Sequence, residues 1–291
     1  MTLELFVEQV INGLITGSIY ALFAVGLALI LGVMDVVNTA HGEIFMLGAY
    51  SAVAAVGAGP WLYLPIAALT GFIVGVLIDT FALRPLRRRR GVDMHLASII
   101  LTFGISMILQ NGALQLFGAK YQKLPALVAG ATSIGNMVFI NQHLLTFALA
   151  LTAMVLLFGF LQYSRLGQAI RATAQNPDAA RLVGIKTDRV SMLTLGIGAA
   201  LAAVAGALIA PLYFVHPTMG NNIILKGFAI VIVGGMGSIP GAVAGAILLG
   251  VAESIGASFL SYGYKDAIGF MLLAAVLLVR PLGLFGTATR Y

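Results

Sequence analysis

The sequence contains no cysteine and few charged residues. The absence of cysteine excludes disulfide bonds and thiolate metal sites. Asp, Glu, Lys and Arg together make up only 9% of the 291 residues, whereas a soluble domain carries about 25%. Hydrophobic residues account for 60%, and the mean hydropathy is +1.03. There is too little polar material to cover a surface in contact with water, so the sequence predicts a membrane protein.

Motifs typical of nucleotide-binding proteins and of enzymes are also missing. No glycine-rich loop ends in Gly-Lys-Ser or Gly-Lys-Thr, so no nucleotide site is expected. The four histidines are scattered, and Ser, His and acid form no nucleophile elbow. The net charge of +6 does not indicate nucleic-acid binding, because the basic residues fall in short loops between apolar segments. We therefore expect no catalytic residue, no cofactor, no metal ion and no nucleic-acid partner.

What the sequence does contain is a series of long apolar segments. About 20 apolar residues in a helix cross a bilayer core, and the candidate segments are 5–31, 41–57, 61–82, 95–117, 143–163, 190–215, 223–236, 241–260 and 264–279. Backbone polar groups in lipid must be satisfied within a segment, and the alternation that a barrel needs is absent. The predicted fold is all-α: a polytopic membrane helical bundle of about eight to ten transmembrane segments, including short or broken helices. No linker divides the chain, so 1–291 is expected to be a single transmembrane domain.

The basic residues predict an orientation by the positive-inside rule. Arg84–Arg90, the charged stretch 164–189 and the tail with Arg280 and Arg290 are assigned to the cytoplasm. The remaining lysines then lie outside: Lys120, Lys123, Lys226 and Lys265. This assignment makes the N-terminus periplasmic and the C-terminus cytoplasmic. The first segment lacks a basic n-region and is expected to be a retained span. The external connection 118–142 is expected to be an ordered loop or a short surface helix.

Residues 164–189 form a charged island between two apolar segments. Within it, Asn176 suits the N-cap of a short helix, Pro177 its first position and Asp178 the positive end of its dipole. Gly184 suits the left-handed residue that ends a helix. A capped helix on one face of the bilayer indicates that this region is presented to a partner.

Three acidic or basic side chains near the spans have two interpretations each. His41 and Glu43 belong to the polar segment 38–43, which is expected at the internal entrance to the second span. A polar helix start at the membrane interface is favoured, and the alternative is an inner gate or a partner contact. Glu253 is the most membrane-embedded acid by sequence. An interfacial or paired position is favoured for it, and the alternative is recognition of a substrate ammonium group or a role in gating.

Glycines and small polar residues recur at helical spacing. Gly235 and Gly237 lie in the turn 234–241, which predicts an internal hairpin between two short helices. Helix packing is favoured there, and a broken helix beside the translocation path is the alternative. Polar side chains within spans usually bond between helices, but some line a solute path. The candidates for such a path are Asn12, Thr16, Ser106 and Gln110.

Several motifs together resemble the permease subunits of branched-chain amino acid ABC transporters of the leucine-isoleucine-valine type. They are Asn12-Gly13 followed by 17–22 (Gly-Ser-Ile-Tyr-Ala-Leu), 38–50 (Asn-Thr-Ala-His-Gly-Glu-Ile-Phe-Met-Leu-Gly-Ala-Tyr), 163–167, 182–190, 234–241 with Glu253, and Tyr264-Lys265-Asp266. The resemblance covers nearly the whole chain. It implies a bacterial inner-membrane subunit, in contact with membrane lipid, that works with a second homologous permease, two cytoplasmic ABC ATPases and a periplasmic substrate-binding protein.

The resemblance also implies a mechanism in which this chain is not itself an enzyme. The helix 177–183 would sit in a groove on an ATPase, and closure of the two ATPases would push it and tilt the adjoining spans. The implied roles are apolar contact by Leu182 and Val183, polar pairing by Asp178 and Arg181, anchoring by Arg165 and Arg171, and helix ends formed by Asn176, Pro177 and Gly184. Permeases for urea and short-chain amides have similar motifs, which leaves that substrate class as an alternative. An ion-coupled secondary transporter is a second alternative, disfavoured because ionisable residues are nearly absent from the spans.

Overall fold

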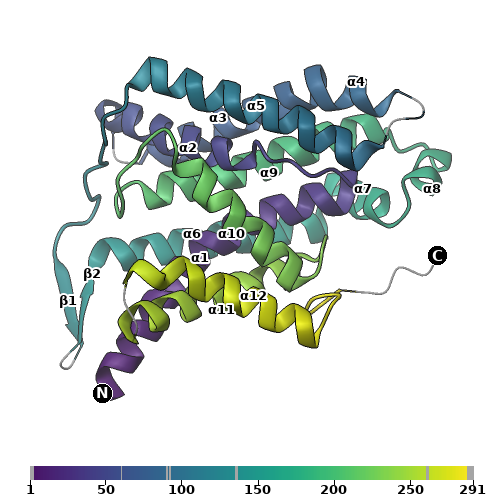
Figure 1. Cartoon of the computed structure of the whole chain (residues 1–291). Coiled ribbons are helices and arrows are strands. Elements are labelled where there is room, and N and C mark those ends of the chain that lie inside the picture. The colour runs from purple at the N-terminus through teal and green to yellow at the C-terminus, as the bar shows by residue number, and fades with distance from the viewer. Residues whose placement is uncertain are drawn as a thin grey trace.

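The computed structural model describes residues 3–59, 61–89, 91, 93–134, 137–259 and 262–286. Six helices within this part of the chain are long and apolar enough to cross a membrane: Glu4–Met34, Tyr63–Arg87, Met94–Phe117, Asn141–Tyr163, Thr187–Ile209 and Ile239–Ser258. Shorter helices lie among them (Figure 1). The prediction of an all-α membrane bundle with long and short helices is therefore confirmed.

Each predicted segment forms a helix at the expected place. These helices are α1 (Leu3–Met34), α2 (His41–Ala54), α3 (Tyr63–Ile78), α5 (Met94–Phe117), α6 (Asn141–Tyr163), α9 (Thr187–Ile209), α10 (Met219–Gly234), α11 (Ile239–Phe259) and α12 (Lys265–Val279). The shorter elements are η1 (Ala55–Ala58), η2 (Asp79–Leu83), α4 (Arg84–Arg87), α7 (Arg165–Gln175), α8 (Pro177–Leu182) and η3 (Tyr262–Tyr264). With 14 and 16 residues, α2 and α10 are too short to cross a bilayer alone. The expectation of two short helices around 234–241 holds only for α10, because α11 has 21 residues.

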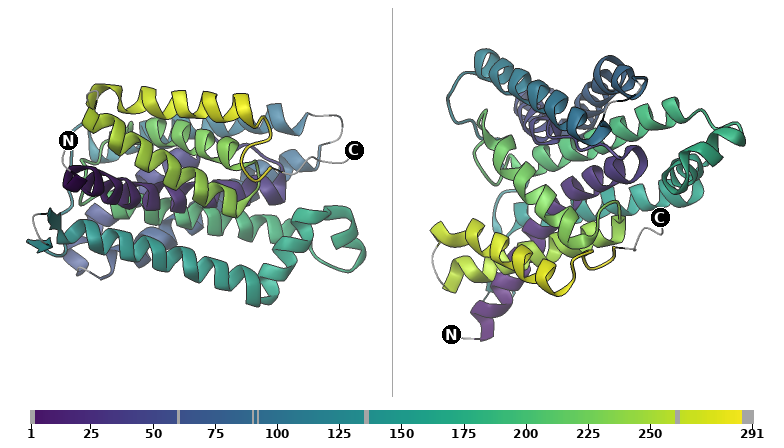
Figure 2. Two further views of the ribbon diagram at one scale, coloured as in Figure 1. Left: turned by 90° about the horizontal axis from the view of Figure 1, so that it is seen from below. Right: turned by 45° about the vertical axis from the view of Figure 1, so that its right-hand side comes forward.

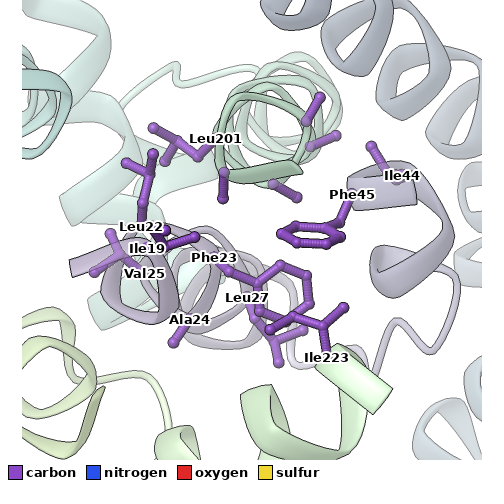
Figure 3. Close-up of a cluster of buried hydrophobic side chains, with 14 of the residues drawn as sticks. Ile19, Leu22, Phe23, Ala24, Val25, Leu27, Ile44, Phe45, Leu201 and Ile223 are labelled. Atoms are coloured by element: carbon purple, nitrogen blue, oxygen red, sulfur yellow. The ribbon is translucent and has the colours of Figure 1, made fainter. Parts of the chain in front are cut away.

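The central helix α1 is held by close packing against its neighbours. Gly13 lies against the backbone of Val251 in α11, where an added Cβ would come within 2.6 Å of its Cα. Helices in lipid associate through such small-residue contacts, since apolar burial provides no driving force between them. Above this crossing, the buried rings of Phe23 and Phe45 meet edge to face, with centroids 5.6 Å apart. Figure 3 shows these rings in the cluster that joins α1, α2, α9 and α10.

The two ends of the bundle carry different elements (Figures 1 and 2). One end, here called the hairpin end, has the antiparallel strands β1 (Ala131–Ile134) and β2 (Met137–Ile140). The connection 118–142 is thus an ordered loop with a β-hairpin, and its described residues form no surface helix. The opposite end, here called the α8 end, has α4, α7, α8 and the last described residues. Arg88 and Asp188 form an ion pair there, at 3.1 Å.

The connection between α1 and α2 turns back into the bundle. Asp35 has a left-handed φ of 52°, a conformation that short polar side chains tolerate, and its carboxylate lies 3.2 Å from His95 near the start of α5. The chain then follows α5 without helical structure until the hydroxyl groups of Thr39 and Thr102 meet at 2.9 Å. Helix α2 consequently begins inside the bundle, beside the middle of α5, rather than at the α8 end.

Candidate functional site

The charged island folds into two short helices, α7 and α8, with Asn176 between them. The Asn176 side-chain oxygen accepts hydrogen bonds from the backbone N–H groups of Asp178 (3.0 Å) and Ala179 (2.9 Å). Pro177 occupies the first position of α8. Gly184 has a φ of 87°, in the left-handed region. The caps predicted from the sequence are present at both ends, and they fix the conformation of a helix that is too short to be stable alone.

Helix α8 projects from the bundle (Figure 2), and apolar side chains at its C-terminal end are uncovered. Leu182 is 89% exposed and Val183 is 76% exposed. The polar residues of α8 bond within this chain: Arg181 donates to Asp178 (2.9 Å) and to the Thr187 hydroxyl (3.0 Å). Thr187 is the first residue of α9. Arg181 therefore attaches α8 to a long helix while the apolar pair next to it stays exposed.

Helix α7 attaches the other side of the island to the bundle. Its Ile170 side chain is buried against the bundle, and it packs on α6, α1 and α9. The Arg171 guanidinium donates to the carbonyl oxygen of Leu161, near the end of α6. Arg165 is exposed. The two arginines predicted as anchors thus differ: Arg171 joins α7 to α6, and Arg165 points to the surroundings.

A second polar group lies deep in the bundle, where α2, α5 and α10 meet. Glu43, in the first turn of α2, is 1% exposed. Ser106, at the middle of α5, donates a hydrogen bond to Glu43 Oε1 (3.3 Å). Glu43 Oε2 has no hydrogen-bond partner within the described residues. This oxygen faces Gly220 in the first turn of α10, where a Cβ would lie 2.7 Å from it. The carboxylate is therefore buried with one neutral donor and one open oxygen.

His41 and Glu43 lie deeper than the sequence predicted. His41 is fully buried, its Nε2 is 3.3 Å from the Phe23 carbonyl oxygen, and the two rings are 4.8 Å apart. The expectation that both residues lie at the internal entrance to the second span is wrong. The reason is the returning connection 35–40, which carries the start of α2 to the middle of α5. The two side chains consequently do not line an inner mouth in this conformation.

Glu253 lies in a separate cluster between α1, α10, α11 and α12. It is also 1% exposed, but charges surround it. Lys226 Nζ is 2.7 Å from Glu253 Oε1 and 2.8 Å from Asp266, and Lys265 Nζ is 3.6 Å from Oε2. The Tyr20 hydroxyl donates to Oε2 at 3.0 Å. The structure thus gives Glu253 the paired position that the sequence favoured, and it is no more buried than Glu43.

The partners in these ion pairs were not identified from the sequence, although a signal was present. Lys226 is the single basic residue in the apolar segment 223–236, and an isolated charge in such a segment requires a partner. Asp79 is a similar case near the α8 end. It is fully buried, and Arg87 (2.8 Å) and Arg84 (3.4 Å) hold its carboxylate. These arginines lie five and eight residues after Asp79, outside the three- or four-residue spacing that pairs side chains on an α-helix. The π-helical segment η2 precedes them, so α-helical spacing alone does not indicate this group.

The four residues predicted to line a solute path do not form one group. Ser106 contacts Glu43, and Gln110 lies one turn further along α5, half-buried. Asn12 and Thr16 lie on α1, where the Thr16 hydroxyl donates to the Asn12 carbonyl (3.1 Å). Helix α5 packs against α2 and α4. The structure therefore places Ser106 in contact with Glu43 and Gln110 one turn away on the same helix, and it places Asn12 and Thr16 on α1.

Gly235 and Gly237 shape the turn between α10 and α11 at the α8 end. Their φ angles are 104° and 78°. Gly237 lies against Gly32 near the end of α1, where an added Cβ would meet backbone at 3.1 Å. The backbone N–H groups of residues 284 and 285 donate to carbonyl groups at the end of α10 (2.7 and 3.0 Å). The turn is therefore packed between α1 and the last described segment, which matches the packing interpretation.

Comparison with known proteins gives this architecture a family. A family described as branched-chain amino acid transport system / permease component matches residues 9–279. The chain is 38% identical to the high-affinity branched-chain amino acid transport system permease protein LivH of Escherichia coli (strain K12), over 97% of this chain and 96% of that protein. It is 37% identical to the corresponding protein BraD of Pseudomonas aeruginosa, with the same coverage.

A more distant relative is the permease protein LivM of Escherichia coli (strain K12), which is 29% identical over 91% of this chain and 67% of that protein. The solved structure of PsaBC from Streptococcus pneumoniae in complex with Fab aligns with a TM-score of 0.49 at 13% identity, over 92% of this chain and 89% of that chain. The apolar helices and the LivH and BraD matches establish a multi-pass membrane protein. The chain belongs to the branched-chain amino acid transport permease family.

Proposed function

We propose that this chain is one permease subunit of an ATP-driven importer of branched-chain amino acids in a bacterial inner membrane. The names of LivH and BraD supply the substrate class. Similarity to both LivH and LivM supports a partnership with a second, homologous permease. Two cytoplasmic ABC ATPases hydrolyse ATP, and a periplasmic binding protein delivers the amino acid.

The observation that carries this proposal is the capped, exposed helix α8. A side chain such as Leu182, 89% exposed at the tip of a rigid projection, costs free energy in water unless a partner covers it. The caps at Asn176 and Gly184 hold the helix in one conformation, so binding to a groove loses little conformational entropy. An ATPase groove that accepts Leu182 and Val183 fits this geometry.

The attachments of α8 supply a route for the force. Arg181 joins α8 to Thr187 at the start of α9, and Arg171 joins α7 to Leu161 in α6. Helix α9 packs along α1, α2 and α3. A displacement of α8 would therefore shift α6 and α9 together, and α9 would carry the movement to the centre of the bundle. The binding site for the amino acid would open alternately to the two sides.

The distribution of charge supports the orientation of this subunit. Arg84, Arg87 and Arg88 lie at the α8 end with the charged island, while Lys120 and Lys123 lie in the loop that leads to the hairpin. The positive-inside rule assigns the end with more arginine and lysine to the cytoplasm. The N-terminus is then periplasmic and the C-terminus cytoplasmic, and α8 faces the ATPases.

Reconstitution tests this function. The chain is co-expressed with its partner permease and ATPases, and leucine uptake into proteoliposomes is measured with the binding protein and ATP. We expect uptake that requires ATP. The substitution Leu182→Asp should abolish it and release the ATPases, whereas Val138→Asp, at a 59% exposed position in the hairpin, should not. Uptake that survives ATP depletion and collapses with an ion gradient would contradict the proposal, and urea uptake in place of leucine would change the substrate class.

A further inference from the structure

Glu43 has no role in the coupling mechanism, yet its surroundings are unusual for a buried acid. It lies in α2 beside the middle of α5 and is 1% exposed, with Ser106 on one oxygen and no partner for the other within the described residues. We propose that Glu43 binds the α-ammonium group of the amino acid as it passes the middle of the membrane. This inference rests on the proposed function and deepens it.

A carboxylate in an apolar interior strongly requires a counter-charge. Burying an ionised acid without one costs several kcal/mol, and a single neutral hydroxyl offsets only part of that cost. Glu253 shows how this chain stabilises a buried acid for structural purposes, with Lys226 at 2.7 Å and Lys265 at 3.6 Å. Glu43 has no such pair within the described residues. A cation that arrives and leaves therefore fits Glu43 better than a permanent partner does.

The open oxygen has the right chemistry for a primary ammonium group. An ammonium group offers three N–H donors and one positive charge. Glu43 Oε2 has no hydrogen-bond partner among the described residues, and the Ser106 hydroxyl, which donates to Oε1, can also accept a bond. A charge-assisted hydrogen bond to the free oxygen would be about twice as strong as a neutral one. Glu43 would thus supply the charged contact for the ammonium group of an amino acid in a bundle whose other side chains are mostly apolar.

Glycine lets the backbone of α10 approach the carboxylate closely. Glu43 Oε2 faces Gly220, and Gly220 also lies against the Gly42 carbonyl, where a Cβ would come within 2.7 Å of either oxygen. No side chain at these two positions reaches over the carboxylate. The neighbouring surface of α10 is polar, since Asn221 and Asn222 are exposed. Exposed amides in a membrane segment indicate contact with water or a partner rather than lipid.

The buried state of Glu43 is consistent with alternating access. Ser106 is 8% exposed and Glu43 is 1% exposed, so a solute reaches them only when α2, α5 and α10 move apart. Both α2 and α10 have their first turn at this point and are too short to span the bundle. Transporters commonly form their substrate sites at such discontinuous helices. The movement transmitted through α9, which packs against α2, would expose Glu43.

The first experiment separates binding from coupling. Glu43→Gln, Glu43→Asp and Thr194→Val are measured in the reconstituted complex for leucine uptake and for ATP hydrolysis stimulated by the binding protein. Thr194 in α9 is the matched control, because it is fully buried and its hydroxyl has no hydrogen-bond partner in the part of the chain that the structure describes. We expect Glu43→Gln to lower uptake by about tenfold or more, the value of one charge-assisted hydrogen bond, with ATP hydrolysis retained. Glu43→Asp should be intermediate and Thr194→Val unchanged.

The result that would overturn the inference is wild-type uptake by Glu43→Gln, or an equal loss of uptake, hydrolysis and assembly, which would indicate a structural role. If the wild-type complex itself shows no ATP-dependent leucine uptake, the proposed function fails and this inference fails with it. If the wild type transports leucine and Glu43→Gln matches it, only this inference fails.

A second experiment measures the reactivity of a thiol placed beside Glu43 and does not depend on transport. The chain has no cysteine, so Ser106→Cys places a single thiol of this subunit beside Glu43. In a complex whose other subunits lack cysteine, the thiol is treated during ATP turnover with a methanethiosulfonate carrying an aminoethyl group or a neutral methyl group. We expect faster reaction with the aminoethyl reagent, protection by leucine, and loss of the preference in Ser106→Cys/Glu43→Gln. An unchanged preference in the double variant would contradict ammonium binding at Glu43.

Discussion

The Glu253 cluster and helix α8 differ in whether this chain alone supplies the contacts that their side chains need. Around Glu253, Lys226 and Lys265 neutralise the buried charge, the Tyr20 hydroxyl donates a hydrogen bond to it, and Asp266 pairs with Lys226, all within one subunit. In α8, the polar residues are satisfied but the apolar Leu182 and Val183 are left in the open. The first region is complete without a partner, and the second is not. We infer that Glu253 serves the stability of the fold and α8 serves the interaction with an ATPase.

Glu43 combines features of both regions. It is as buried as Glu253, yet one of its oxygens lacks a partner within the described residues, as the apolar tip of α8 lacks a covering surface. If groups that lack a partner within the chain serve its function, substitution of Glu43 should affect transport more than stability. Substitution of Glu253 should have the opposite effect.

Removal of Lys226 should have the largest effect, and it should be on stability. Lys226→Ala leaves Glu253 and Asp266 without their closest cation, and breaking a buried pair costs about 3–5 kcal/mol. Thermal unfolding of the purified subunit in detergent measures the change. Lys120→Ala removes an exposed lysine and serves as the control, with no measurable shift expected. An equal melting temperature for both variants would show that the cluster does not stabilise the fold.

The pair Glu253→Gln and Glu43→Gln sharpens the contrast between the two buried acids. Glu253→Gln removes the charge that holds two lysines and should lower the free energy of unfolding by about 1–3 kcal/mol. Glu43→Gln keeps the hydrogen bond to Ser106 and removes an uncompensated charge, so the free energy of unfolding should change by less than about 1 kcal/mol. Denaturation of both variants under identical conditions checks this. A larger loss for Glu43→Gln would remove the distinction.

A substitution at Gly184 should disturb coupling while the bundle stays folded. Gly184→Val forces a β-branched residue to a φ of 87°, at a cost of about 1–2 kcal/mol confined to the end of α8. We expect ATP-coupled uptake to fall and the melting temperature of the bundle to stay unchanged. Gly91→Val is the matched control, because Gly91 has a φ of 76° and free space around its Cα. Full coupled uptake by Gly184→Val would contradict the role of α8 geometry.

The loss of the N-cap should have the smallest effect. Asn176→Ala removes the side-chain acceptor for two backbone N–H groups and should destabilise α8 by about 1 kcal/mol. Uptake should decrease without being abolished. Asp93→Ala removes a similar cap from α5 (3.0 and 3.2 Å) and should leave the ratio of amino acid transported to ATP hydrolysed unchanged. A lower ratio for Asp93→Ala than for Asn176→Ala would show that α8 has no special position in coupling.

The features that the sequence predicted well are those set by local physical chemistry. The length of the apolar segments predicted where the helices lie, and the residue types at 176, 177 and 184 predicted the caps of α8. The depth of Glu43 could not be predicted, because it depends on the returning connection 35–40 and its contact with Thr102 in α5. The cluster around Glu253 joins residues far apart along the chain, and the separation of Thr16 from Ser106 likewise depends on which helices are neighbours.

Cross-linking of α8 tests the central claim most directly. A single cysteine introduced by Val183→Cys into this cysteine-free chain is treated with a short thiol-reactive cross-linker in the assembled complex, and Val138→Cys at the hairpin end is the control. We predict a covalent adduct between Val183→Cys and an ATPase subunit, with a yield that changes when ATP is added, and none from Val138→Cys. An adduct with the periplasmic binding protein, or no adduct with an ATPase in an intact complex, would contradict the account.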